Sequence, residues 1–236
     1  MTSGRVQFVG CGPGAADLLT LRAARAIAEA DVVVWSRSLL DEDVVCAHAR
    51  PGVEIVAWPP ATERDILALY DRAHDEGLRV VRLKGGDPAL FGALEPELGA
   101  VRRRGLAWEI VPGVSAVSAA AAELGCELAG AGAPLLLAAA GDLAGAVPAA
   151  IGTAVFGAGR DPGMLERALL ARGLPADTPC AVAVGISRPG AILEACDLRE
   201  LAESVEDLGL GGLTLVIAGP ALAAASVRSR GGGTSD

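Results

Sequence analysis

Three glycine-rich turns are the segments of this sequence best suited to holding a ligand. They cover residues 10–15 (Gly-Cys-Gly-Pro-Gly-Ala), 84–92 (Lys-Gly-Gly-Asp-Pro-Ala-Leu-Phe-Gly) and 111–116 (Val-Pro-Gly-Val-Ser-Ala), and each follows an apolar run. Glycine lets a backbone approach a ligand closely and adopts turn conformations that other residues resist. If the apolar runs are neighbouring parallel strands, the turns meet at one edge of the sheet, where open α/β sheets bind their ligands.

The first turn also matches the G-x-G-x-x-G/A spacing of dinucleotide-binding enzymes, so a Rossmann-type dehydrogenase is one alternative. Two features disfavour it. Pro13 removes a backbone N–H from the loop that should cradle a pyrophosphate, and the second strand ends at Trp35-Ser36 without an acid to hold a ribose. The simpler alternatives are steric: a tight strand-to-helix turn for the first loop, and helix capping for Asp87 and Ser115.

The histidines and cysteines of the sequence give little support for metal-dependent or nucleophilic catalysis. The chain has two histidines, neither in a recognisable motif, and five scattered cysteines without C-x-x-C spacing. This pattern argues against a zinc site and a disulfide framework and predicts no metal. The cysteines are expected to be small buried residues.

Charge and hydropathy narrow the possible partners. The formal net charge of −9 disfavours a nucleic-acid partner, because binding to phosphates needs a clustered basic surface. No apolar run approaches the roughly 20 residues that a membrane-spanning helix requires. The N-terminus lacks the pattern of a secretory signal, so we expect a cytoplasmic protein without a membrane partner.

Strand-like and helix-like runs alternate along the chain, which predicts an α/β fold. The runs in the first half cover residues 6–9, 18–28, 32–35, 55–57, 66–74, 79–83, 90–103 and 108–111. Those in the second half cover residues 135–139, 153–156, 164–171, 181–184, 191–195, 198–205 and 213–218. A Gly/Ala/Pro-rich stretch at 125–134 predicts a junction between domains 1–126 and 127–224, followed by a disordered tail, 225–236.

Three helix starts carry local signals. Asp17 is expected to cap a helix that begins at Leu18, and Thr62 with Asp65 approximates a capping box. Asp87-Pro88 is expected to open the helix that follows the second glycine-rich turn.

The three turns, in this order and spacing and with Asp17-Leu18-Leu19-Thr20 after the first, resemble the tetrapyrrole (corrin/porphyrin) methyltransferase family. The resemblance implies a homodimer of two α/β domains with S-adenosyl-methionine in the cleft between them. It places the cofactor against ten residues: Gly85, Gly86, Asp87, Leu90, Ser115, Phe156, Gly157, Val184, Gly185 and Thr214.

The resemblance also implies a tetrapyrrole substrate that carries many carboxylates. Pro13 and its loop would face this substrate, and Asp87 with the Pro13 loop would align the reactants. Because the protein is acidic overall, positive charge has to be concentrated locally. Arg37, Lys84 and Arg160 are the candidates for this role, and ordinary solvated charges are the alternative reading for each.

Within the family, residues 35–40, 48–52 and 70–79 most resemble the precorrin-4 C11-methyltransferases of cobalamin biosynthesis. Lys84-Gly85-Gly86-Asp87-Pro88 is more typical of uroporphyrinogen-III methyltransferases, so another tetrapyrrole carbon is an alternative target. The segment 129–140, almost all Ala, Gly and Leu, leaves open a catalytically silent relative. Methyl transfer from a sulfonium needs alignment and exclusion of water more than acid–base groups, and these effects supply about 7–11 kcal/mol.

Overall fold

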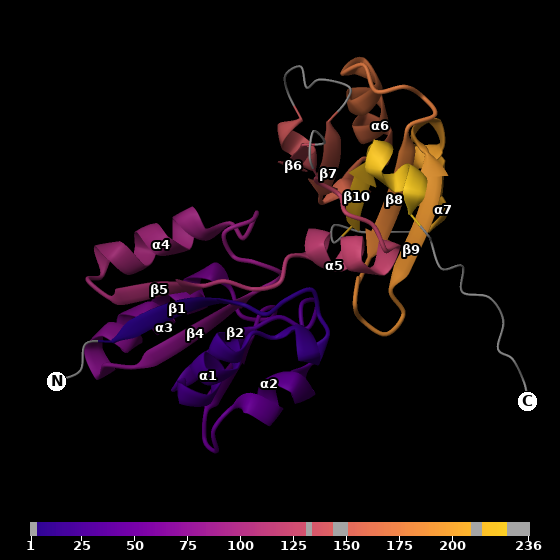
Figure 1. Ribbon diagram of the computed structural model, residues 1–236. Helices are drawn as coiled ribbons and strands as arrows, with labels where there is room; N and C mark the ends of the chain where they lie inside the picture. The colour runs from indigo at the N-terminus through magenta and orange to yellow at the C-terminus, as the bar shows by residue number, and fades with distance from the viewer. Residues whose placement is uncertain (1–3, 131–133, 144–150, 209–213, 226–236) are drawn as a thin grey trace, which may run out of the picture. The chain divides into compact units, whose positions relative to one another are not determined.

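The computed structural model describes residues 4–130, 134–143, 151–208 and 214–225 (Figure 1). The chain forms two compact units, Met1–Ala116 and Val117–Asp236, and each contains one five-stranded sheet. Helices accompany both sheets, which confirms the predicted α/β class. The part of the predicted disordered tail from 226 to 236 lies outside the described residues.

The first sheet is entirely parallel, as the alternating pattern predicts. Its strands are arranged in the order β3-β2-β4-β1-β5. Their bounds are Arg5–Gly10 for β1, Val32–Trp35 for β2, Glu54–Ala57 for β3, Arg79–Lys84 for β4 and Ala107–Val111 for β5. All four residues of β2 are buried, since helices cover both faces of a parallel sheet.

Two helices cover each face of this sheet. The helices α1 (Leu21–Glu29) and α2 (Glu42–His48) pack with Val9 and Val33, whereas α3 (Glu63–Glu76) and α4 (Leu94–Arg103) pack with Phe8 and Val34. Adjacent strand residues thus enter opposite cores, because side chains alternate along a strand. The neighbouring strands β1 and β4 lead to helices on opposite faces, and this makes their carboxyl ends a topological switch point.

The second sheet is mixed and has the order β6-β7-β10-β8-β9. Its strands are β6 (Leu135–Ala139), β7 (Gly152–Phe156), β8 (Pro179–Val184), β9 (Ile192–Asp197) and β10 (Thr214–Ala218). Only β6 and β7 pair in parallel, and β10 runs antiparallel between β7 and β8.

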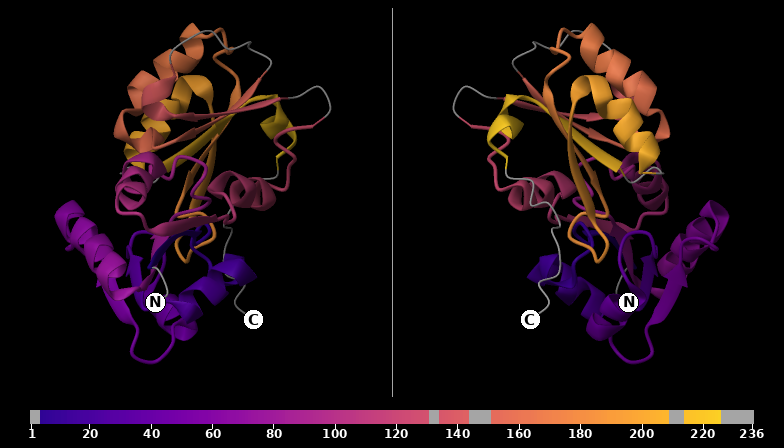
Figure 2. Two further views of the ribbon diagram at one scale, coloured as in Figure 1. Left: turned by 90° about the vertical axis from the view of Figure 1, so that its left-hand side faces the viewer. Right: turned by 90° about the vertical axis from the view of Figure 1, so that its right-hand side faces the viewer.

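Three α-helices belong with this second sheet in the described part of the chain: α5 (Ala116–Leu124), α6 (Pro162–Ala171) and α7 (Leu201–Asp207). Leu165 and Leu169 of α6 and Leu201 and Val205 of α7 share one core with buried valines of β7, β8 and β10. Figure 2 shows α6 and α7 side by side on this sheet.

Local capping explains where α1 and α3 begin. The predicted capping box of α3 is confirmed: the Thr62 hydroxyl accepts from the Asp65 N–H, and the Asp65 carboxylate accepts from the Thr62 N–H. The expected Asp17 cap is wrong, because residues 16–18 form a separate 3-10 turn and Thr20 caps α1 instead. The expected start of a helix at Asp87-Pro88 is also wrong, since residues 88–91 form a turn and α4 begins at Leu94.

None of the helices in the described residues combines the length and hydrophobicity needed to cross a bilayer. Among the same residues, no group of three or more His, Cys, Asp or Glu side chains is arranged to hold a metal ion.

Candidate functional site

The first two glycine-rich turns are joined directly at the carboxyl ends of β1 and β4. The Cys11 N–H donates to the carbonyl of Lys84 at 2.8 Å. Gly12 and Gly86 then exchange two backbone hydrogen bonds, with N···O distances of 3.3 and 2.7 Å, and form an antiparallel bridge. The switch point of the first sheet is therefore built from backbone groups of two turns rather than from side chains.

The third turn is locked against the other two by close backbone contacts. A Cβ on Gly113 would lie 2.2 Å from the carbonyl oxygen of Gly86, and a Cβ on Gly10 would lie 2.6 Å from the nitrogen of Gly113. Neither position tolerates a side chain without movement of the backbone. These two glycines consequently hold the turns together, whereas Gly86 adopts φ +61° and has room around a Cβ, with the nearest atom 3.7 Å away.

The loop that follows Gly86 is tightly wound and strained. The Asp87 carboxylate accepts from the Ala89 N–H at 2.8 Å, and the Asp87 carbonyl accepts from the Leu90 N–H at 3.0 Å. Phe91 and Ala93 have φ values of +59° and +48°, a left-handed conformation that non-glycine residues rarely adopt. Such strain clusters at ligand-binding loops. Leu90 and Phe91, in this loop, are 37% and 46% exposed.

The remaining predicted residues of the first unit have different surroundings. Ser115 lies beside the second turn, since a Cβ on Gly86 would be 3.8 Å from the Ser115 Cα. Pro13 is half-buried in the first turn. The Arg37 side chain is 84% exposed, lies 3.5 Å from the carboxylate of Glu42 and stacks over the Trp35 ring.

Lys84 faces the protein interior. Only 9% of the residue is exposed, and its ammonium donates to a carboxylate oxygen of Glu97 at 2.5 Å. Burial, together with the nearby Arg82, lowers the pKa of Lys84, although Glu97 opposes this change. The geometry gives Lys84 a structural partner, so only Arg37 and Arg160 remain as candidates for contact with an anionic substrate.

The five predicted cofactor residues of the second unit meet at one edge of its sheet. Because β10 runs antiparallel to both neighbours, its first residue, Thr214, pairs with Val184 at the end of β8, and Leu215 pairs with Phe156 at the end of β7. Gly157 and Gly185 follow these strand ends with φ values of +73° and +56°.

Gly185 and Arg160 follow the ends of β8 and β7. A Cβ on Gly185 would meet no atom within 4 Å, so its backbone borders open space. Arg160, exposed, ends the short 3-10 turn that follows Gly157. Strand pairing therefore brings Phe156 and Thr214, which are far apart in the sequence, to the same edge of the sheet.

The same chain was compared with known proteins. Residues 5–202 match the family model described as tetrapyrrole (corrin/porphyrin) methylases. The chain belongs to this family. The predicted resemblance is confirmed, and with it the assignment of the chain to the S-adenosyl-methionine-dependent methyltransferases.

Similar proteins of the methylase family match both units. A precorrin-4 C(11)-methyltransferase of Rhodococcus erythropolis is 34% identical, and the match covers 93% of this chain and 92% of that protein. The crystal structure of a cobalamin-biosynthetic cobalt precorrin-4 methyltransferase has a TM-score of 0.81 and 27% identity, covering 92% of this chain and 95% of that one. A uroporphyrin-III C-methyltransferase of Thermus thermophilus, complexed with S-adenosyl-homocysteine, has a TM-score of 0.73 and 31% identity, covering 93% and 99%.

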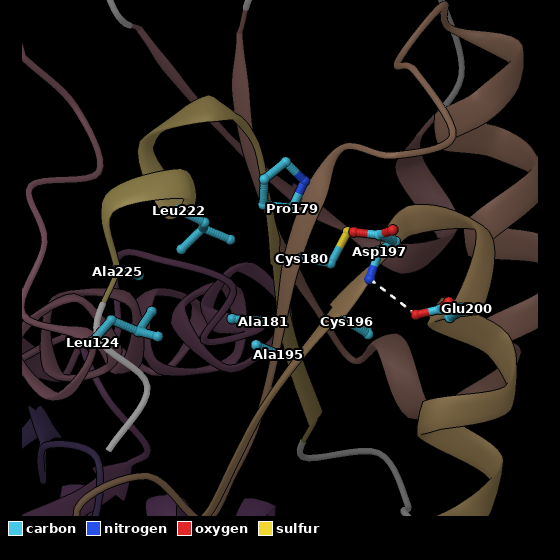
Figure 3. A pocket seen from close by; sticks show the side chains of 10 residues that line it. All are labelled: Leu124, Pro179, Cys180, Ala181, Ala195, Cys196, Asp197, Glu200, Leu222 and Ala225. Atoms are coloured by element: carbon cyan, nitrogen blue, oxygen red, sulfur yellow. Dashed lines mark hydrogen bonds between the residues drawn. The ribbon is translucent and has the colours of Figure 1, made fainter. Parts of the chain in front are cut away.

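A cavity of about 340 Å³ in the second unit of this methylase is distinct from the predicted site (Figure 3). Cys180, Cys196, Asp197 and Glu200 contribute to its lining, and none of the predicted site residues does. Cys180 and Cys196 face each other across β8 and β9. Burial raises the pKa of both thiols, so they are poor nucleophiles at neutral pH.

Glu97, which pairs with Lys84, and Tyr70, which donates to Glu97, were not predicted from the sequence. A signal for them exists in the chain: Arg82 and Lys84 lie on either side of Leu83 at the end of β4, directly after the apolar pair Val80-Val81. Because buried cations require anionic or hydrogen-bonding partners, this alternation predicts a carboxylate on a covering helix.

Proposed function

We propose that the protein transfers a methyl group from S-adenosyl-methionine to a ring carbon of an anionic corrin precursor, with C11 of precorrin-4 as the target. The observation that carries this proposal is the extent of the match to the Rhodococcus precorrin-4 C(11)-methyltransferase, which includes 93% of this chain and 92% of that enzyme. Both units contribute to the similarity, so the likeness extends beyond one shared motif.

The residues at the two strand edges fit an adenosyl ligand. S-adenosyl-methionine supplies a sulfonium-bound methyl group that a carbon nucleophile takes in one in-line step. Gly86 and Gly185 offer backbone groups unshielded by a side chain, and the nearby Leu90 and Phe156 offer apolar surface. We infer that Gly85, Asp87 and Ser115 in the first unit, and Gly157, Val184 and Thr214 in the second, also contribute to cofactor binding. The S-adenosyl-homocysteine complex of the Thermus relative supports this choice of ligand.

Substrate binding is assigned to exposed cationic side chains. Arg37 and Arg160 are exposed and suit carboxylates, which guanidinium groups bind through paired hydrogen bonds. We propose that the Pro13 loop aligns the substrate, because it is bonded to the Gly86 turn. We also expect a cytoplasmic homodimer without a nucleic-acid partner. Light scattering of the purified protein tests the dimer.

A binding and turnover experiment tests the function. Calorimetric titration with S-adenosyl-methionine, S-adenosyl-homocysteine and NAD is expected to show binding of both adenosyl ligands and none of NAD. Incubation with S-adenosyl-methionine and precorrin-4 is expected to yield a product with one additional methyl group, located at C11 by NMR. Binding of NAD alone would overturn the proposal.

Uroporphyrinogen III is the second substrate to assay. The Thermus uroporphyrin-III C-methyltransferase is 31% identical over 93% of this chain, and the sequence Lys84-Gly85-Gly86-Asp87-Pro88 is typical of that branch. Preferential turnover of uroporphyrinogen III over precorrin-4 would establish this alternative. Binding of the cofactor without turnover of either substrate would indicate a silent relative.

Matched glycine variants test the two proposed cofactor edges. Gly86→Val and Gly185→Val place bulk where backbone is expected to meet the ligand, and both are expected to weaken binding of S-adenosyl-homocysteine. Gly105→Val and Gly190→Val are the controls, because these glycines also have positive φ, and a Cβ on either would meet no atom within 4 Å. Equal affinity in a folded site variant and its control would contradict the placement.

A further inference from the structure

Four polar side chains form a largely buried cluster under the carboxyl end of β4, in which the Glu97 side chain is 22% exposed. Arg82 and Lys84 lie two residues apart on the strand and are 6% and 9% exposed. Both donate to Glu97 of α4, Arg82 at 3.1 Å and Lys84 at 2.5 Å. The Tyr70 hydroxyl of α3 donates to the same carboxylate at 2.9 Å. One carboxylate therefore holds two cations and a phenol.

Stability alone is a weak reason for such a cluster. Removing charged groups from water costs free energy that the attraction within a buried ion pair often fails to recover. Apolar residues of similar size often give the same stability. Here the two cations outnumber the single anion. The guanidinium of Arg82 also lies over the Trp58 ring, 5.1 Å from its centre. The face of an aromatic ring attracts a cation more strongly than it attracts a neutral side chain.

The position of the cluster suggests its purpose. Lys84 is the last residue of β4, and its carbonyl accepts from the Cys11 N–H of the first turn. The next two residues, Gly85 and Gly86, lack side chains that could anchor them. Consequently Lys84 is the last residue before the Gly86 turn whose side chain is anchored in the protein interior. Its anchor is the carboxylate of Glu97.

We propose that Glu97 is a positioning residue that, through Lys84, fixes the backbone of the Gly85–Gly86 turn for ligand binding. The proposal rests on the proposed function in one respect, namely that this turn contacts S-adenosyl-methionine. Burial opposes ionisation of Glu97, but Arg82 and Lys84 outweigh it and lower the pKa of the carboxyl. Glu97 is thus charged at neutral pH.

Glu97→Gln is the direct test, with Glu95→Gln as the control. Glu95 lies on the same helix with its side chain 84% exposed, and its only role among the described contacts is a surface pair with Arg102 at 3.8 Å. The affinity of Glu97→Gln for S-adenosyl-homocysteine, measured by calorimetry, is expected to fall about tenfold or more, as occurs when groups that orient a binding residue are removed. Glu95→Gln is expected to match the unaltered protein.

A double variant separates positioning from stability. Glu97→Gln leaves two buried cations without an anion, whereas Lys84→Met/Glu97→Gln restores the original net charge of the cluster. The double variant is expected to recover much of the lost thermal stability yet keep the weakened affinity, because Lys84 no longer anchors the turn. Full recovery of affinity together with stability would show that the cluster is only structural and would overturn the proposal.

Hydrogen exchange provides a readout that does not require the cofactor. The Gly12 and Gly86 amides donate across the bridge between the two turns. Both are expected to exchange faster in Glu97→Gln and in the double variant, with the interior amides of α1 unchanged. Should the unaltered protein bind neither adenosyl ligand, the proposed function fails, while this comparison still decides whether Glu97 holds the turn. Unchanged exchange at both glycines would overturn the inference.

Discussion

The glycines of the first unit illustrate how one residue type serves different purposes. Gly113 allows two backbones to touch, Gly86 adopts a left-handed turn, and Gly99 lies inside α4. Substitution should therefore have different effects at the three positions, although a sequence motif treats all glycines alike.

Gly113→Ala is expected to destabilise the protein. Its methyl group would lie 2.2 Å from the Gly86 carbonyl oxygen, and backbone has to move to relieve this contact. The cost is expected to be about 1–3 kcal/mol, as for other overpacked sites, with a parallel loss of cofactor affinity. Urea denaturation followed by tryptophan fluorescence measures the first effect, because Trp35, Trp58 and Trp108 are the three tryptophans of the chain and all lie in Met1–Ala116.

Gly99→Ala is the matched control and is expected to increase the stability of the protein. A Cβ at this position meets only the end of the Arg103 side chain, at 3.2 Å, which can move aside. Alanine in a helix interior is favoured over glycine by about 0.5–1 kcal/mol. Equal destabilisation by both substitutions would contradict the steric explanation given for Gly113.

Lys84 shows what residue types alone do not reveal. Its place in a glycine-rich turn predicted contact with an anionic substrate, but Lys84 is also the end of a strand whose side chains alternate between two covered faces. Which face it enters depends on the register of β4 and on Glu97, thirteen residues away. Arg37, by contrast, is exposed as its interpretation as a substrate-binding residue requires.

At the level of elements, strands were predicted better than helix starts. The strands 32–35 and 135–139 agree with the structure to the residue, because each is an apolar run bounded by residues that disfavour strands. The helix α2 was missed, since only Val45 of its seven residues is buried and the apolar pattern is correspondingly weak. The start of α4 depends on left-handed Phe91 and Ala93, conformations that the sequence of those residues does not indicate.

The capping box of α3 offers a test at this scale. Thr62→Ala removes the side chain that accepts from the Asp65 N–H and leaves a helix-terminal donor without that partner. The unfolding free energy is expected to fall by about 0.5–2 kcal/mol. Thr62→Ser keeps the hydroxyl and is expected to retain most of the stability. A loss in the serine variant equal to that in the alanine variant would show that the methyl group, not the cap, matters.

For the whole molecule, local patterns predicted the α/β class but not the order of the strands. The antiparallel β10 joins the ends of β7 and β8 although 58 positions separate Phe156 from Thr214. Such pairing depends on long-range register, which periodicity does not encode. The clustering of the predicted cofactor residues in the second unit therefore came from the family resemblance, whereas the residue pattern already predicted that the turns of the first unit meet.

The two units are expected to differ in their response to pH. Carboxyl groups with lowered pKa values lie in the first unit: Asp65 through its hydrogen bonds with Thr62, Asp71 through Arg104, and Glu97 through Arg82 and Lys84. These carboxylates contribute fully to the free energy of unfolding above their unfolded pKa, about 4. The contribution is lost as the pH falls through their lower folded pKa values. In the second unit, burial raises the pKa of the Cys180 and Cys196 thiols. Unfolded thiols ionise above about pH 8.5 while the folded ones keep their protons, so stability falls as the pH rises beyond that value.

Thermal unfolding followed with two probes tests this difference. Tryptophan fluorescence reports only the first unit, whereas far-ultraviolet circular dichroism reports both. At about pH 3 the fluorescence transition is expected to move to lower temperature, and at about pH 9.5 a dichroism transition without a fluorescence counterpart is expected to move instead. Cys180→Ala/Cys196→Ala should reduce the alkaline shift and leave the acid shift intact, and we assign the remaining alkaline shift to Cys126, the pKa of which burial also raises. If both probes moved together in acid and in base, the two units would unfold as one, and the separate assignment of acid and alkaline sensitivity would be wrong.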